Sequence, residues 1–271
     1  DPFSTIPGVV ILWDVESGQE IRRFDGHSSG VDSAVFSPDG RSMVSGAGDG
    51  VIILWDIATG QEIRRFVGHH AIVDNAAFSP DGQKLLSGGI DGTVILWDVK
   101  TGQELRRFVG HKGLITNVVF SPDGRNALSS SWDDDVIIWD VATGAIVRHL
   151  TGHSAASLTV SLSPDGRQAF AGSADNTSLL WDVTTGAILR RYPGGADGSA
   201  FSPDGGSVVV AVSDVLEMWR IDSTLDELLS WTRANRYVPE LTCEQRALYN
   251  LEPLCPEGTA TPAGEATPAS K

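Results

Sequence analysis

One stretch decides the fold of this chain: GHHAIVDNAAFSPDGQKLLSGGIDGTVILWDVKTGQELRRFV, residues 68–109 of 271. Its pattern recurs along most of the sequence, and repeats of about 20–50 residues indicate stacked copies of one structural unit. Three short motifs return, and the first two keep a step of 42 residues. Trp-Asp begins at Trp13, Trp55, Trp97, Trp139 and Trp181; Gly-His begins at Gly26, Gly68, Gly110 and Gly152; Ser-Pro-Asp-Gly begins at Ser37, Ser79, Ser121, Ser163 and, three residues early, Ser202. The chain is therefore built from copies of one unit.

Each complete unit predicts four β-strands. In residues 50–69, VIILWDI is an apolar, β-branched run that suits a buried strand. A glycine-containing turn follows, and QEIRRFV is expected to form the outermost strand. The strands of the first complete unit are predicted near 31–37, 41–46, 51–56 and 61–66, and later units repeat them 42, 84 and 126 residues further on. Paired arginines on the outermost strand would protect an exposed sheet edge from pairing with other chains: Arg22-Arg23, Arg64-Arg65, Arg106-Arg107 and Arg190-Arg191.

A 42-residue period that carries Gly-His and Trp-Asp resembles the WD-repeat (WD40) β-propeller family. The near identity of adjacent copies is similar to prokaryotic members. The resemblance implies an all-β fold, a β-propeller of four-stranded antiparallel blades with five repeat units after an N-terminal half unit. It also implies closure of the ring by an N-terminal outer strand, for which residues 20–24 are the candidate, leaving residues 9–13 surplus. Because seven blades are commoner in the family, we expect the C-terminal part of a longer propeller, with a five-bladed ring as the alternative.

The organisation expected from these patterns has four parts. Residues 1–7 do not fit the repeat, and residues 8–222 form the propeller. A short C-terminal helical extension, a cap of two helices, is predicted over 223–255 because capping boxes begin at Thr224 and Thr242. The tail, 256–271, is rich in Pro, Ala, Thr and Gly and is predicted to be a disordered linker.

Composition narrows the class of partner and the compartment. A net charge of −15 favours solubility and disfavours nucleic acid and anionic membranes, whose phosphates require basic patches. The sequence has no apolar run long enough to span a bilayer, and we see no signal-peptide pattern. Cys243 and Cys255 lie outside the repeats, where a disulfide or two reduced thiols are equally consistent with their spacing. A cytoplasmic location is favoured, and a disulfide would instead indicate export.

Each intact unit contains a His, a Ser, an Asp and a Trp that invite comparison with a hydrolase triad. Catalysis requires one exposed nucleophile with an oxyanion hole, whereas this set occurs in three units. The resemblance assigns it to a structural tetrad in which Asp holds His, His meets Ser, and Ser meets the indole N–H. We therefore expect no catalytic residue and no cofactor. The sets are His27, Ser45, Asp49 and Trp55; His69, Ser87, Asp91 and Trp97; His111, Ser129, Asp133 and Trp139; and His153, Asp175 and Trp181, with Ala171 in the Ser position.

No metal site is expected either. Three consecutive carboxylates, residues 133–135, could attract a divalent cation. Adjacent side chains on a turn between strands point in different directions, and Asp133 already belongs to a tetrad. The acidic run is therefore interpreted as part of the blade.

Comparison of the copies shows which positions the blade does not dictate. Residues vary after Gly-His, just before the tetrad Asp, and early in the first strand. In WD-repeat proteins these positions line the top rim of the central channel, which is the usual docking face. The expected partner-binding residues are Asp32, Ile72, Asp74, Ile90, Leu114, Thr116, Trp132, Leu158 and Asp197.

The sequence predicts a non-catalytic scaffold for protein–protein interaction. Its rim is expected to bind a protein or peptide with basic and hydrophobic groups. The resemblance implies a module of a larger protein, for which a signalling protein is one option, because prokaryotic arrays are often joined to signalling domains. Two alternatives stay open: a propeller that binds a small ligand or performs catalysis in its central channel, and self-assembly through an incomplete ring, with another copy or with an upstream fragment.

Overall fold

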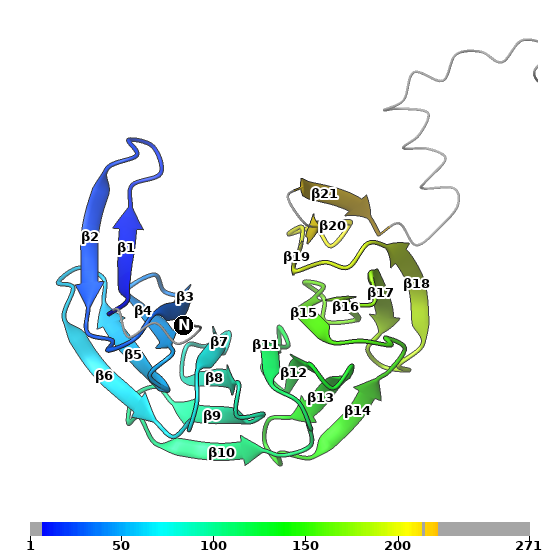
Figure 1. Ribbon diagram of the computed structural model, residues 1–271, viewed down its shortest axis with the longest axis horizontal. Helices are drawn as coiled ribbons and strands as arrows, with labels where there is room; N and C mark the ends of the chain where they lie inside the picture. The colour runs from blue at the N-terminus through cyan, green and yellow to red at the C-terminus, as the bar shows by residue number, and fades with distance from the viewer. Residues whose placement is uncertain (1–6, 213–214, 222–271) are drawn as a thin grey trace, which may run out of the picture. The chain divides into compact units, whose positions relative to one another are not determined.

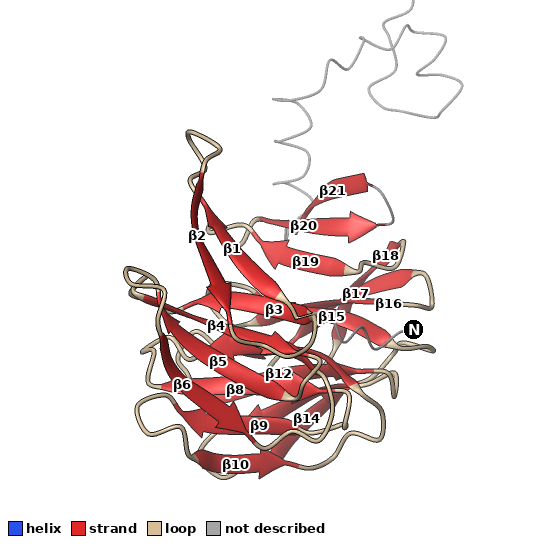
Figure 2. Cartoon of the chain, turned by 60° about the vertical axis from the view of Figure 1, so that its left-hand side comes forward, coloured by secondary structure: helices blue, strands red, loops and turns tan. Residues whose placement is uncertain are grey.

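The protein folds as a series of antiparallel β-sheets (Figure 1). The computed structural model describes residues 7–212 and 215–221, and within them it contains twenty-one strands and no helix (Figure 2). A helix long and apolar enough to cross a membrane is thus not found in this part of the chain. The all-β fold predicted from the repeats is confirmed.

Six sheets follow one another along the chain. A two-stranded sheet comes first, four sheets have four strands each, and the last has three. Their strands are β1 (Val9–Trp13) and β2 (Glu20–Asp25); β3 (Val31–Phe36), β4 (Ser42–Ala47), β5 (Val51–Asp56) and β6 (Glu62–Val67); β7 (Val73–Phe78), β8 (Lys84–Gly89), β9 (Val94–Asp98) and β10 (Glu104–Phe108); β11 (Ile115–Phe120), β12 (Asn126–Ser131), β13 (Val136–Asp140) and β14 (Ile146–Leu150); β15 (Ser157–Leu162), β16 (Gln168–Ser173), β17 (Thr177–Asp182) and β18 (Ile188–Pro193); and β19 (Gly198–Phe201), β20 (Ser207–Val212) and β21 (Val215–Arg220).

The sheets are arranged as the blades of a β-propeller. Within each four-stranded sheet the strands lie in chain order, so that every neighbour is reached through a short turn. The first strands of successive sheets contact each other, β3 with β7, β7 with β11, β11 with β15 and β15 with β19. Figure 1 shows these strands on the inner side of the array and β6, β10, β14 and β18 on its outer side.

The hydrophobic core lies between neighbouring sheets. One cluster joins Val44 and Ile52 of one sheet with Val73, Leu85 and Trp97 of the next. Each apolar strand therefore buries side chains on both faces, which explains why runs such as VIILW are continuous rather than alternating. The same cluster recurs one and two sheets further along the chain.

The Ser-Pro-Asp-Gly motif forms the turn between the first and second strands. Ser79 Oγ donates to Asp81 Oδ1 at 2.6 Å, and that oxygen also accepts the N–H of Gln83 at 3.0 Å. Gly82 adopts a φ of +69°, which a side chain would disfavour. A Cβ on Gly124 of the next turn would lie 3.6 Å from Cδ of Pro80, so successive turns pack against each other. The repeated motif is thus explained by turn geometry and packing.

The paired arginines do more than protect a sheet edge. Arg22 on β2 donates to the carbonyls of Ala58 and Thr59, in the turn of the following sheet, at 2.9 and 3.0 Å. A Cβ on Gly60 would lie 2.7 Å from Cδ of Arg22, so glycine is required beside the guanidinium stem. Equivalent bonds start from Arg64, Arg106 and Arg148. The arginine at this position on β2, β6, β10 and β14 therefore joins two sheets.

The N-terminal half unit forms its own sheet. β1 pairs with β2, with Val9 opposite Asp25 and Trp13 opposite Glu20. Residues 9–13 therefore have a strand partner. They are not surplus, as they would be if β2 completed the last sheet of a closed ring. Within residues 7–212 and 215–221, β21 pairs only with β20. The predicted helical cap and tail, with Cys243 and Cys255, lie outside the described residues.

Candidate functional site

The candidate site is the end of the sheets opposite the Ser-Pro-Asp-Gly turns. We call this surface the upper rim. It consists of the loops that lead from the fourth strand of one sheet to the first strand of the next, together with the turns between second and third strands. A backbone hydrogen bond joins the loop to the turn. The N–H of Ile90 donates to the carbonyl of Ile72 at 2.9 Å, and the N–H of Trp132 donates to the carbonyl of Leu114 at 3.0 Å. The variable positions singled out in the sequence are thus neighbours in pairs.

Buried hydrogen bonds anchor the rim. In the sheet of β7–β10, Nδ1 of His69 lies 3.2 and 3.1 Å from the carboxylate oxygens of Asp91. Its Nε2 lies 2.7 Å from Ser87 Oγ, which also accepts the indole N–H of Trp97 at 2.8 Å. Since the indole donates, the hydroxyl hydrogen is free for Nε2, and Nδ1 carries the proton toward Asp91. Ser87 is fully buried, so its hydroxyl is not available to a substrate.

The same connections occur in two further sheets. Nε2 lies 2.8 Å from the serine hydroxyl in both, and the indole donates to that hydroxyl at 2.8 and 2.7 Å. In each of the three sheets the aspartate also accepts the N–H of the residue after the histidine, which fixes the start of the loop. The two further sets are His27, Ser45, Asp49 and Trp55, and His111, Ser129, Asp133 and Trp139, and the N–H groups belong to Ser28, His70 and Lys112.

The fourth set is incomplete. Asp175 Oδ2 lies 3.1 Å from His153 Nδ1, but Nε2 of His153 is buried without a hydrogen-bond partner among the described residues. The indole of Trp181 turns instead to the carbonyl of Thr151 at 3.2 Å. Ala171 in the serine position accounts for both changes. In the last sheet Gly195 takes the histidine position, and Asp214 lies outside the described residues.

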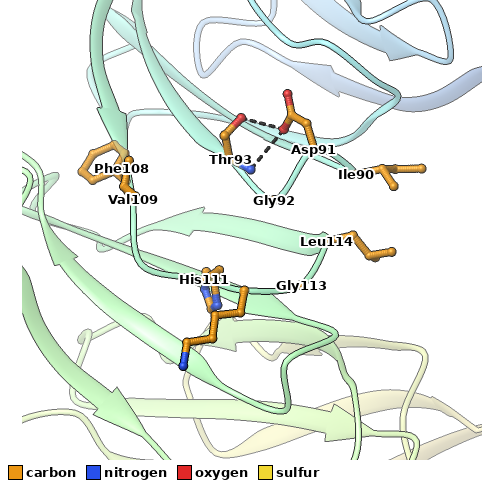
Figure 3. A pocket seen from close by; sticks show the side chains of 10 residues that line it. Ile90, Asp91, Gly92, Thr93, Phe108, Val109, His111, Gly113 and Leu114 are labelled. Atoms are coloured by element: carbon orange, nitrogen blue, oxygen red, sulfur yellow. Dashed lines mark hydrogen bonds between the residues drawn. The ribbon is translucent and has the colours of Figure 1, made fainter.

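In the set of β7–β10 a neutral imidazole lies beside an ionised carboxylate. Burial lowers the pKa of His69, although the charge of Asp91 acts against this. Burial alone would raise the pKa of Asp91, but hydrogen bonds from Thr93 and from the N–H of His70 hold it below its usual value (Figure 3). The aspartate is therefore an ionised acceptor for several donors at neutral pH.

A pocket lies between the sheets of β7–β10 and β11–β14. Its volume is about 380 Å³, and Ile90 and Leu114 form its two lips, with both side chains extending to the same side (Figure 3). Trp132, beside Leu114, is 58 % exposed. Ile72, Ile90, Leu114 and Trp132 thus form a series across two sheets, which we call the apolar strip. Of the apolar rim residues predicted from the sequence, only Leu158 lies outside the apolar strip.

Two carboxylates lie near the strip on the first strands of their sheets. Burial raises the pKa of Asp74 on β7, and the charge of Asp32 on β3 raises it further. Burial also raises the pKa of Asp32. Neither carboxylate has a hydrogen bond or ion pair within the described part of the chain. The two acids thus form an unneutralised negative patch.

The remaining predicted rim residues, Thr116, Leu158 and Asp197, differ in burial and in hydrogen bonding. Thr116 donates to the carbonyl of Ser157 at 2.7 Å and lies 2.8 Å from Ser130 Oγ, so its hydroxyl joins two sheets. Leu158 is partly buried on β15, and Asp197 is exposed just before β19. The structure therefore brings together the apolar strip and two of the three acids.

One side-chain contact of this rim was not predicted from the sequence. His149 on β14 hydrogen-bonds Asp135, while Asp133 binds His111 and Asp134 adopts a φ of +70°. The three consecutive carboxylates thus diverge, and the described residues contain no cluster of three or more His, Cys, Asp or Glu that could hold a metal. A signal was present: this unit replaces the usual second arginine by His149 and the usual Thr or Val by Asp135.

A comparison with protein families agrees with this geometry. The model of the WD domain, G-beta repeat, matches the chain four times, at residues 18–56, 60–98, 102–140 and 144–182. Each match starts in or just after the turn before an outer strand and ends at the Trp-Asp of the next sheet, and together they cover more than half of the chain. The chain therefore belongs to the WD40 family of G-beta repeat proteins.

Proposed function

We propose that this protein is a non-catalytic interaction module that binds a protein or peptide through its upper rim. WD40 repeats generally serve as scaffolds for protein–protein interaction. The observation that carries the proposal is the apolar strip, which ends in the largely exposed Trp132. Tryptophan on a well-anchored loop is a typical energetic centre of a protein interface.

The chemistry of the partner follows from what surrounds the strip. Asp32 and Asp74 supply negative charge that no described residue neutralises. A partner with basic residues would neutralise them, and its apolar side chains would cover Ile90, Leu114 and Trp132. Charge complementarity of this kind contributes mainly to specificity and to the rate of association.

The buried hydrogen-bonded sets support binding rather than catalysis. The serine that a hydrolase would use is fully buried in three sheets and is already shared by a histidine and an indole. Instead, each set fixes one end of a rim loop through its aspartate. A rim fixed in this way loses little conformational entropy on binding, which favours affinity.

The proposal is tested with peptides selected on the intact protein. Random peptides of about twelve residues are displayed on phage and selected, and affinities are then measured by calorimetry. We expect the double variant Trp132→Ala/Asp74→Lys to weaken binding by at least about tenfold, since it removes an interface anchor and reverses a charge. The matched control is Trp13→Ala/Glu16→Lys, which makes the same changes at exposed positions of the first sheet. Unchanged affinity in the rim variant, with an unchanged melting temperature, would refute the docking face.

A further inference from the structure

A second cleft lies along the inner edges of the sheets. It has a volume of about 470 Å³ and is lined by β7, β11, β15 and β19, four of the strands on the inner side of the array (Figure 1), and by two prolines of the Ser-Pro-Asp-Gly turns. None of its lining residues is charged. The cleft therefore suits an uncharged group.

The cleft changes in character along the strands. At the end next to the turns, its walls are Phe120, Leu162 and Phe201, all partly buried. Toward the upper rim its walls include the amides of Asn75 and Asn117. An apolar side chain is thus favoured at the lower end, and hydrogen-bonding groups are favoured above it.

Hydrogen-bonding capacity remains unused in the upper half. The amide oxygen of Asn75 accepts the N–H of Val118 at 3.4 Å, whereas the amide oxygen of Asn117 is buried without a partner among the described residues. In that same part of the chain β11 pairs only with β12, and β15 only with β16. The inner edges of these strands thus carry backbone groups with no strand partner, which an extended peptide can bind.

The chain carries an acidic group next to the upper end of the cleft, although this group is not one of the lining residues. Asp74 directly precedes Asn75 on β7, and no described residue neutralises it. It lies four residues before Phe78, the counterpart of Phe120, one sheet earlier. With a rise of about 3.4 Å per strand residue, the acidic and apolar levels are about 14 Å apart, which an extended segment spans in about four residues.

We propose that the inner cleft binds an extended segment of the partner, which places an apolar side chain between Phe120 and Phe201 and a basic side chain against Asp74. The two side chains are about four residues apart in the segment. This inference rests on the proposed function, because it assigns a second anchor to the partner that the rim binds. It adds a spacing rule that the rim alone does not impose.

Synthetic peptides test the spacing on the full chain. Fluorescein-labelled peptides in a Ser/Gly background carry one Arg and one Leu, either about four or about eight residues apart, and controls replace either residue by Ser. Fluorescence polarisation is expected to show binding at least about tenfold tighter for the four-residue spacing than for the other peptides. Equal affinities across the set, or no measurable binding by any peptide, would overturn the inference.

Two variants locate the bound leucine. Ala200→Leu narrows the cleft at an exposed alanine of its wall, and Ala187→Leu makes the same change at an exposed turn outside it. We expect only Ala200→Leu to weaken the Arg–Leu peptide by at least about tenfold, and Asp74→Asn to abolish the preference for Arg over Ser. If Ala200→Leu has no effect while Trp132→Ala weakens the phage-selected peptides, the cleft is refuted and the proposed function stands. If neither Ala200→Leu nor Trp132→Ala weakens binding, both the cleft and the proposed function are refuted.

Discussion

At the scale of single residues, neighbouring copies compensate for each other's substitutions. A Cβ on Gly88 would lie 2.5 Å from Ile115 of the next sheet, so the small residue makes room for the large one. One sheet further along, the pair becomes Ser130 and Ser157, both fully buried. Two small side chains thus replace a glycine and a large side chain, so that the pair still fills the space between the sheets.

The missing serine of the fourth sheet gives a prediction at this scale. Ala171→Ser would place a hydroxyl between the partnerless His153 Nε2 and the indole of Trp181. We expect the free energy of unfolding, measured by urea denaturation, to rise by about 0.5–1.5 kcal/mol.

A neighbouring alanine provides the control for this substitution. Ala169→Ser, also fully buried on β16, adds a hydroxyl inside an apolar cluster. It should lower the same free energy by about 1–3 kcal/mol, because the buried hydroxyl gains no partner there. Equal losses in the two variants would contradict the role assigned to the hydrogen-bonded sets.

At the scale of elements, the sequence predicted the strands well and the contacts between sheets poorly. The expected strand 41–46, for example, differs by one residue at each end from β4. The repeat made this possible, since each apolar run is seen several times. By contrast, the bond of Arg22 joins β2 to a turn of the next sheet, and the bond of His149 joins β14 to Asp135 in the turn before β13 of the same sheet. No pattern within one copy shows which strands face each other, so only the packed sheets reveal them.

The bond between sheets made by the first arginine predicts a stabilising role. Arg64 donates to the carbonyl of Thr101 at 2.8 Å and lies partly buried on β6. We expect Arg64→Met to lower the free energy of unfolding by about 1 kcal/mol, the usual value of one hydrogen bond at a partly exposed site. Hydrogen exchange should also become faster in the turn that holds Thr101.

The control for Arg64 is another arginine in the same sheet. Arg41 is exposed in a Ser-Pro-Asp-Gly turn. Arg41→Met should leave both the free energy of unfolding and the exchange of the Thr101 turn unchanged, since surface charges contribute little. If the two variants behave alike, the arginine bond does not hold the sheets together.

At the scale of the whole molecule, the repeat separates stability from recognition. The framework residues of each sheet stay constant because they form turns, anchors and core, whereas the rim residues are free to change. The sequence located the individual rim positions, but the apolar strip became visible only when two sheets were placed side by side. In the proposed function, Asp74 is a residue at which stability and recognition conflict, because burial opposes its charge.

This conflict gives a test that depends on pH. The pKa of Asp74 is raised in the folded protein, so the ionised carboxylate opposes folding. The free energy of unfolding therefore decreases as the pH rises from the usual pKa of an aspartate to the raised pKa of the folded protein. Asp74→Asn should therefore increase the free energy of unfolding at pH 7, and the gain should disappear below about pH 4, where the native aspartate is protonated. Asp81 is the matched control in the same sheet, since the hydroxyl of Ser79 lowers its pKa. Asp81→Asn should lower stability at pH 7, and a gain of stability there in both variants would show that overall charge, rather than the buried position of Asp74, is responsible.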